Sequence, residues 1–219
     1  MSNAPSGVAP AFDERFRKQL DDLLAWRRDI RHFKTDPVDP ALVDHLIHMA
    51  CLSPSVGNSQ PWRFVVVEDP VLRGRVRENF AEANADALQD YCGERARLYA
   101  TLKLSGLDKA PVQLAMFCDE GGALGHGLGS RTMPQTLDHS VAGAAVILSL
   151  VARAYGVGVG YVSIFDPDRL TADLDVPETW RFVAYMCIGW PDIEDSREPE
   201  LQRRGWQDRL DHAHFIVRR

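Results

Sequence analysis

The chain has 219 residues, of which 45% are hydrophobic and 26% are charged, the proportions of a globular protein. A chain of this length buries about 70% of its unfolded surface, enough for a core without disulfide or metal staples. Its 25 basic and 31 acidic residues give a net charge of −6, which argues against a general nucleic-acid surface. No linker-like stretch divides it, so we expect a flexible N-terminus at 1–11 and one domain over 12–219.

Cysteine usage and hydropathy point to a reduced compartment. Cys51, Cys92, Cys118 and Cys187 lie far apart and form no C-x-x-C pair, so we expect reduced thiols. The first residues have neither the positive region nor the apolar core of a signal peptide, and no run reaches the ~18 apolar residues of a membrane helix. The sequence therefore predicts a cytoplasmic protein without a membrane partner.

The N-terminal half reads as two helices, a loop and a strand. Apolar residues at helical spacing predict a first helix from Phe12 to about Trp26 and a second from Pro40 to about Met49. Serine-proline and glycine-asparagine pairs predict a loop over 52–61. The β-branched run at 62–69 predicts a buried strand. Residues 70–106 are mostly polar and helical, with a weak apolar stripe, and predict a lid at about 82–107.

The C-terminal half adds three strands and the most apolar helix. Strands are predicted at 112–119, at 160–165 and at 182–191. The helix from Thr136 to Tyr155 is apolar nearly all round, which predicts a central or interface helix capped by Thr136. The terminal FIVRR reads as a short edge strand or as an arm on a partner subunit. Together these elements predict an α+β fold, with a mixed sheet flanked by helices.

Three arginines and one aspartate stand close together in the stretch RRDIRHF, residues 27–33. Arg27, Arg28 and Arg31 suit a phosphate group, whereas the carboxylate of Asp29 repels the same anion. Two interpretations follow from these residues alone. Asp29 is a salt-bridge partner on a solvated helix end, or it does chemistry beside a bound phosphate ester.

Four stretches in this order resemble the FMN-dependent nitroreductase family: RRDIRHF, PSVGNSQPW, GVGVGYVS and GWQDRL. The family pattern opens with Arg-x-Ser-x-Arg/Lys-x-x-Phe and continues with Pro-Ser-x-x-Asn-x-Gln-Pro-Trp. Its matches in this chain are Arg27, Arg31, Phe33, Pro54, Ser55, Asn58, Gln60, Pro61 and Trp62. The resemblance covers nearly the whole chain, from about Arg27 to Arg209.

The resemblance implies a nitroreductase-like homodimer with two FMN sites at the subunit interface. It implies that arginines hold the phosphate or the ribityl chain, that the loop at 54–58 reaches the flavin across the interface, and that one glycine lies against the isoalloxazine ring. The implied cofactor-binding residues are Arg27, Arg28, Arg31, Pro54, Ser55, Asn58, Gly160 and Arg209.

One departure from the family pattern narrows the resemblance, because this chain has Asp29 where the pattern has serine. One branch of the family has an aspartate at this position. Three further stretches of the chain are also similar to that branch: LKLSGLDKAPVQLAMF, GLGSRTMPQTLDHSV and GVGVGYVSIFDP. Members of that branch use dioxygen to fragment reduced FMN into 5,6-dimethylbenzimidazole and erythrose 4-phosphate, supplying the lower ligand of vitamin B12. The resemblance implies that Asp29 is a general base and that Ser163 hydrogen-bonds the flavin. From the residues alone, Ser163 is equally well a strand serine bonded to backbone.

Two alternatives stay open: an NAD(P)H-dependent nitroreductase that recycles FMN, and a flavin-binding protein without turnover. The fate of the flavin distinguishes them, because it is destroyed, cycled or retained. No nicotinamide pocket is evident in the sequence, so a separate flavin reductase, with NAD(P)H as the indirect reductant, is the expected source of reduced FMN. His126, His139, His212 and His214 lack metal-ligand spacing, and we expect no metal site.

Overall fold

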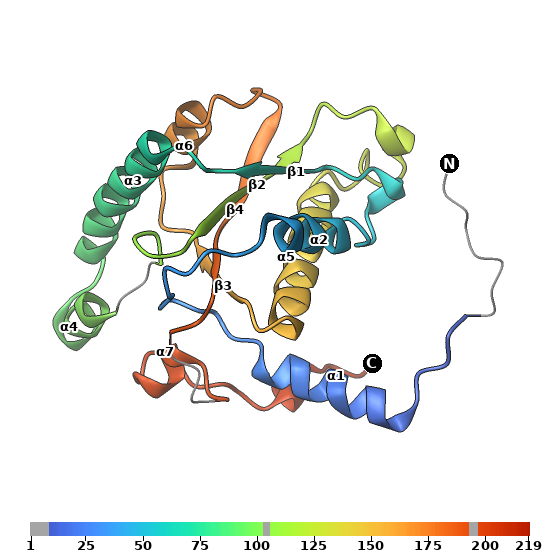
Figure 1. Cartoon of the computed structure of the whole chain (residues 1–219), viewed down its shortest axis with the longest axis horizontal. Coiled ribbons are helices and arrows are strands. Elements are labelled where there is room, and N and C mark those ends of the chain that lie inside the picture. Colours follow the sequence, from blue (N-terminus) through green and yellow to red (C-terminus); the bar gives the residue numbers. More distant parts are fainter. Residues whose placement is uncertain (1–8, 103–105, 193–196) are drawn as a thin grey trace.

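The computed structural model of the chain describes residues 9–102, 106–192 and 197–219 (Figure 1). In these residues the strands form one sheet, in the order β1-β2-β4-β3. The strands are β1 (Trp62–Val66), β2 (Val112–Asp119), β3 (Gly158–Val162) and β4 (Trp180–Gly189). All three strand pairs are antiparallel, and the parallel character of the predicted mixed sheet is confined, among the described residues, to a bridge between Asp29 and Val159.

Helices make up most of the remaining regular structure. The α-helices are α1 (Glu14–Trp26), α2 (Pro40–Ala50), α3 (Pro70–Gln89), α4 (Gly93–Thr101), α5 (Thr136–Ala154), α6 (Pro167–Asp173) and α7 (Glu200–Arg203). The 3-10 helices are η1 (Val56–Asn58), η2 (Leu124–Gly127) and η3 (His212–Phe215). Asp39, Asp69 and Asp166 start α2, α3 and α6 by accepting backbone N–H groups, each followed by a proline that suits the first helical turn.

The sheet separates two hydrophobic cores, as expected when successive side chains of a strand point to opposite faces. Leu114 and Met116 of β2 belong to the core that α2 and α5 cover. Ala115 and Phe117, which alternate with them, belong to the core on the other face, under α3 and α6. Figure 1 shows these helix pairs on opposite sides of the sheet. The fold is therefore a helix–sheet–helix sandwich, and the predicted α+β layering is confirmed.

Two strands were predicted to start two residues too late. β3 was expected at 160–165 but begins at Gly158, which pairs with Gly189, and it ends at Val162. β4 was expected at 182–191 but spans Trp180–Gly189, because it follows β2 to its last residue through a register shift after Met116. Ser163 thus lies just past the end of β3 and not inside a strand, contrary to the prediction.

Two predictions about α5 are wrong. The residue before the helix is Gln135, which makes no side-chain cap, and the Thr136 hydroxyl instead donates to the Met133 carbonyl at 2.6 Å. The helix is also not buried all round, since Val146 is 52% exposed in the single chain. Of the helices in the described residues, α5 alone is long and apolar enough to cross a membrane, but the core helix of a folded domain meets the same test, and α5 packs against the sheet.

The C-terminal residues fold differently from the edge strand considered above. η3 covers His212–Phe215, and residues 216–219 form no strand in this chain. The edge-strand alternative is therefore wrong for the single chain, whereas the partner-arm alternative stays a prediction. In the proposed lid, α3 and α4 are separated by a break before Gly93, while residues 103–105 lie outside the described part of the chain.

A close backbone contact fixes the segment after α1 against β3. The Ile30 amide donates to the Val159 carbonyl at 3.0 Å, and a side chain at Gly160 would overlap the Ile30 carbonyl oxygen. This contact alone requires a glycine at position 160. Its predicted place against a flavin ring stays a prediction.

Gly160→Ala should therefore destabilise the protein, since a methyl group must push the Ile30 backbone off β3. We expect a loss of about 1–3 kcal/mol in the free energy of unfolding, measured by urea denaturation. Gly74→Ala is the matched control: its added carbon would meet only the end of the Arg77 side chain, at 4.0 Å, and it should gain up to about 1 kcal/mol from helix propensity. Equal stability of Gly160→Ala and the unaltered chain would contradict the contact.

Candidate functional site

The RRDIRHF segment is an extended edge of the sheet and not a solvated helix end. α1 ends at Trp26, and the segment then runs beside β3, with Asp29 bridged to Val159. Further on, Phe33 bridges Pro191 and is buried in the core. The arginines and the aspartate are consequently held by backbone pairing at known places along the sheet, and the interpretation as a solvated helix end is wrong.

The carboxylate of Asp29 is held at both oxygens. Oδ1 accepts the Tyr161 backbone N–H at 2.7 Å, and Oδ2 accepts the Arg31 Nε–H at 3.2 Å. Burial raises the pKa of Asp29 above its ordinary value, while the Tyr161 hydrogen bond and the Arg31 charge oppose that rise. The side chain is still 34% exposed in the single chain, so it combines a strengthened proton affinity with access to a ligand. This combination is typical of a general base.

A second group of side chains is a cluster of arginines around Arg28. Its members besides Arg28 are Arg27, Arg153, Arg197 and Arg209. Burial, and then the charges of these four, lower the pKa of Arg28. Its Nη1 donates to the Arg27 carbonyl at 2.8 Å, but its Nε is buried without a partner among the described residues. Like charges and an unsatisfied buried donor favour an anion such as a phosphate dianion.

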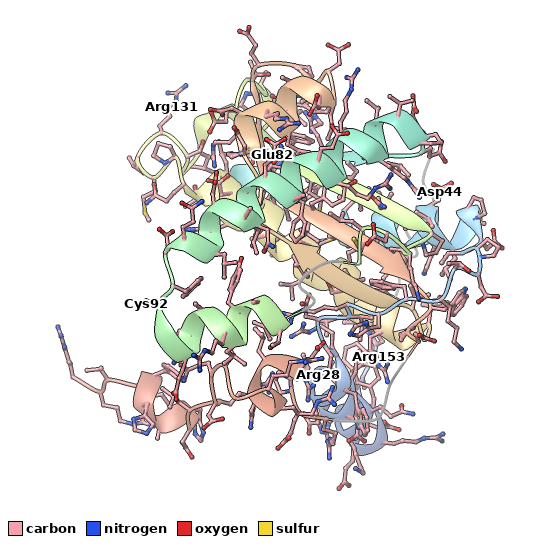
Figure 2. The ribbon with its side chains drawn as sticks, turned by 90° about the vertical axis from the view of Figure 1, so that its left-hand side faces the viewer. Arg28, Asp44, Glu82, Cys92, Arg131 and Arg153 are labelled. Atoms are coloured by element: carbon pink, nitrogen blue, oxygen red, sulfur yellow. The ribbon has the colours of Figure 1, made fainter. Side chains whose placement is uncertain are left out.

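The sequence prediction missed two members of the arginine cluster. Arg153 comes from the last turn of α5, and Figure 2 shows it at the same end of the molecule as Arg28. Arg197 follows the sheet and contacts α1, with Asp22 at 3.5 Å and the Trp26 ring at 5.6 Å. Both are remote from RRDIRHF in sequence, and the only local signal for Arg153 was a charge at the end of an apolar helix.

The loop at 54–58, which was predicted to reach the flavin, lies away from the Asp29 segment in the fold. Its fold is set by internal contacts: the Ser55 hydroxyl accepts the Gln60 N–H at 3.0 Å, and the Val56 N–H donates to the Ser140 hydroxyl of α5 at 3.1 Å. Pro54 and Asn58 are exposed. In Figure 1 this loop, between α2 and β1, lies beside η2 and away from α1. The structure thus joins Asp29, Arg31 and the arginine cluster at one end, and the loop is not brought to them within one chain.

Ser163 is remote from Asp29 in sequence but lies near it in the fold, through β3. It follows β3 by one residue and is exposed. Tyr161, whose backbone N–H holds Asp29, lies two residues before it, so that Ser163 and the carboxylate share the same end of the sheet. The Ser163 side chain is therefore accessible, and its hydrogen bond to a flavin stays a prediction.

An aromatic clasp, formed by Tyr91, Tyr99, Arg95 and Trp206, joins the proposed lid to the C-terminal segment. Tyr91 and Tyr99 stack at 4.8 Å, and Trp206 meets the Tyr91 ring edge-on at 5.5 Å. Arg95 donates to the Trp206 carbonyl at 2.8 Å and lies 5.1 Å from its ring centre. Trp206 precedes Arg209 by three residues, so the clasp links α4 to the arginine cluster.

Metal ligands do not gather in the described part of the chain. Within residues 9–102, 106–192 and 197–219, no three His, Cys, Asp or Glu side chains converge to hold an ion.

Comparison with known proteins agrees with this geometry. The nitroreductase family matches residues 24–190. A 5,6-dimethylbenzimidazole synthase of Rhodospirillum rubrum is 54% identical over 97% of this chain and 99% of that protein. A second protein of that name, from Rhodobacter capsulatus, is 48% identical over 91% of this chain and 96% of that protein.

Solved structures share the fold at lower identity. Iodotyrosine deiodinase bound to FMN and 3-iodo-L-tyrosine gives a TM-score of 0.71 at 23% identity, over 91% of this chain and 97% of that one. A nitroreductase family protein of Streptococcus pneumoniae gives 0.63 at 23% identity, over 91% of this chain and 100% of that one. Since the family match covers most of the chain and the similarity to relatives extends over almost all of it, the chain belongs to the nitroreductase family.

Proposed function

We propose that this protein is a 5,6-dimethylbenzimidazole synthase, which uses dioxygen to fragment reduced FMN into 5,6-dimethylbenzimidazole and erythrose 4-phosphate. The product is the lower ligand of vitamin B12. The observation that carries the proposal is Asp29, a carboxylate of raised pKa held beside an arginine cluster, in a chain 54% identical to a synthase over nearly its full length. A flavin that is only cycled needs no such base beside its phosphate site.

The residues present fit FMN. The arginine cluster offers the charge that a phosphate requires, and the unpaired Arg28 Nε offers a donor to it. Arg27, Arg28 and Arg209 would hold the phosphate end. Pro54, Ser55 and Asn58 would approach the flavin from a second chain, and Gly160 would lie near its ring.

The chain's own groups have three tasks in the reaction. Bound reduced FMN supplies the electrons for dioxygen and the carbon atoms of the product. Asp29 would accept a proton during cleavage of a ribityl carbon–carbon bond, with its carboxylate held in one orientation by the Tyr161 and Arg31 donors. Ser163 donates a hydrogen bond that orients the flavin. The arginine cluster fixes the phosphate, so that the ribityl chain is presented to Asp29.

The segment 82–107 is the proposed lid. Its described part is held by the aromatic clasp to the segment that carries Arg209, so phosphate binding and the position of α4 are linked. Exclusion of water is useful here, because reduced flavin is otherwise oxidised without giving product.

The active form is proposed to be a homodimer in the cytoplasm. α5 exposes Val146, and α1 exposes a stripe that includes Phe16, Leu20 and Leu24, an apolar surface that a second copy would cover. A dimer would also bring the 54–58 loop of one chain to the arginine cluster of the other. Reduced FMN would come from a separate flavin reductase, with NAD(P)H as its donor.

The phosphate role predicts a matched pair of arginine variants. Arg28→Gln should weaken FMN binding by about 10-fold or more, the scale of one lost charge-assisted hydrogen bond, and leave riboflavin binding unchanged. Arg75→Gln, at an exposed arginine of α3, should change neither. Fluorescence titration of both flavins measures these affinities, and equal loss for riboflavin would remove the phosphate role.

The base role predicts a loss of chemistry without a loss of binding. Asp29→Asn is nearly isosteric, so it should keep most of the FMN affinity while formation of 5,6-dimethylbenzimidazole falls by about 100-fold or more. Reduced FMN should then return to intact FMN in air. Asp44→Asn, on the exposed side of α2, is the control.

The assay is to mix each variant with reduced FMN and oxygen and to quantify product against recovered FMN by mass spectrometry. Undiminished product from Asp29→Asn would sink the base role. Intact FMN from the unaltered chain would favour the nitroreductase or flavin-binding alternative.

The dimer predicts that a charge on the exposed face of α5 separates the subunits. Val146→Asp should give a monomer by light scattering, and FMN binding should be lost with the dimer. Val71→Asp is the control, at a valine 64% exposed on α3, in the layer opposite α5. A monomeric unaltered chain that binds FMN, or a dimeric Val146→Asp, would refute the proposed interface.

A further inference from the structure

Arg31 differs from the other arginines of its segment in its contacts. Its side chain is only 11% exposed, and its Nε–H is given to Asp29 Oδ2 at 3.2 Å. Its Nη1 is buried without a partner among the described residues. Arg31 also lines a cavity of about 180 Å³, whose other charged or titratable lining residues are His32, Asp108, Lys109 and Asp192. The Arg31 guanidinium thus pairs with the carboxylate, while the charges of Arg27, Arg153, Arg197 and Arg209 act on Arg28.

The charged and titratable groups that face Asp29 come from three elements. Its own segment supplies Arg27 and Arg31, β3 supplies Tyr161, and β4 supplies Cys187. Burial raises the pKa of Tyr161, and it raises that of Cys187 to about 12, so both are neutral near pH 7. The groups that remain charged are Arg27 and Arg31. Of these, Arg31 donates a hydrogen bond to Asp29.

We propose that Arg31 is a positioning residue for Asp29, which orients the carboxylate and keeps it ionised, and is not a ligand of the phosphate. This rests on the proposed function, since it assigns Arg31 to the base and not to the phosphate. The Tyr161 N–H fixes one oxygen, Arg31 fixes the other, and the plane of the carboxylate is set by the pair. Arg31 therefore acts on the reaction through Asp29.

The sign of the effect follows from the groups around the carboxylate. Burial favours the protonated acid and raises the pKa of Asp29, whereas Arg31 favours the ionised form. Without the Arg31 charge, Asp29 stays protonated up to a higher pH. It can accept a proton only above that pH. The acidic limb of product formation should move up by about 1–2 pH units, the scale of one lost adjacent charge.

The test compares Arg31→Met, Arg31→Lys and Arg28→Met in two measurements that need no turnover. One is the titration of Asp29 in flavin-free protein, by carbon-13 NMR of labelled aspartate, assigned by its absence in Asp29→Asn. The other is the ratio of FMN to riboflavin affinity. The pH profile of product formation is the third measurement.

For Arg31→Met we expect the Asp29 titration to move up by about 1–2 pH units, the acidic limb to follow it, and the FMN-to-riboflavin ratio to stay. Product formation should then recover at alkaline pH. Arg31→Lys keeps the charge and should show a smaller shift. Arg28→Met should do the reverse, lowering the ratio while leaving the Asp29 titration in place.

An Asp29 titration that stays in place in Arg31→Met would overturn the proposal, as would a fall in the FMN-to-riboflavin ratio like that of Arg28→Met. If Arg31→Met does not fold, Arg31→Gln, which also removes the charge, takes its place, and the same two outcomes decide. Failure of the proposed function appears separately, as intact FMN recovered from the unaltered chain, because the NMR titration does not depend on the reaction.

Discussion

The site depends on the backbone pairing of residues 29–33 with the end of the sheet. Ile30 donates to Val159, and the Tyr161 N–H that follows on the same strand is taken by the Asp29 side chain. Gly160 permits the approach, since a larger residue there would overlap Ile30. This pairing buries a carboxylate that solvent would otherwise surround, and the burial raises its pKa. Held in this way, the carboxylate can lie next to the arginine cluster without being the counter-ion of those arginines.

The same pairing places the arginine side chains on opposite sides of the segment. Along an extended segment, successive side chains point to opposite sides, so Arg28 leaves toward the cluster while Asp29 and Arg31 share the other side. The observed interactions follow this alternation: Arg31 donates to Asp29, whereas the charges of Arg209 and Arg153 lower the pKa of Arg28. A motif of three arginines and an acid therefore becomes two functional groups, one for an anion and one for a proton.

The sequence predicts well those features that local pattern controls. β2 and the first two helices fall where the apolar run, the helical periodicity and the first-turn proline place them. The starts of β3 and β4 could not be predicted from the sequence, because they depend on pairing with another strand. Gly158 pairs with Gly189, and Trp180 pairs with Asp119. Within the site, Asp29 stood out as a departure from a family pattern. Its donor Tyr161 and the cluster member Arg153 did not, because tertiary packing alone brings them near.

Product analysis of the unaltered protein tests the central claim most directly. Erythrose 4-phosphate carries four of the five ribityl carbons, so the carbon attached to the ring nitrogen has to remain with the benzimidazole. Reduced FMN labelled with carbon-13 at that position, mixed with the protein in air, should give labelled 5,6-dimethylbenzimidazole and unlabelled erythrose 4-phosphate in equal amounts. Recovery of the label in intact FMN, with no benzimidazole formed, would contradict the account.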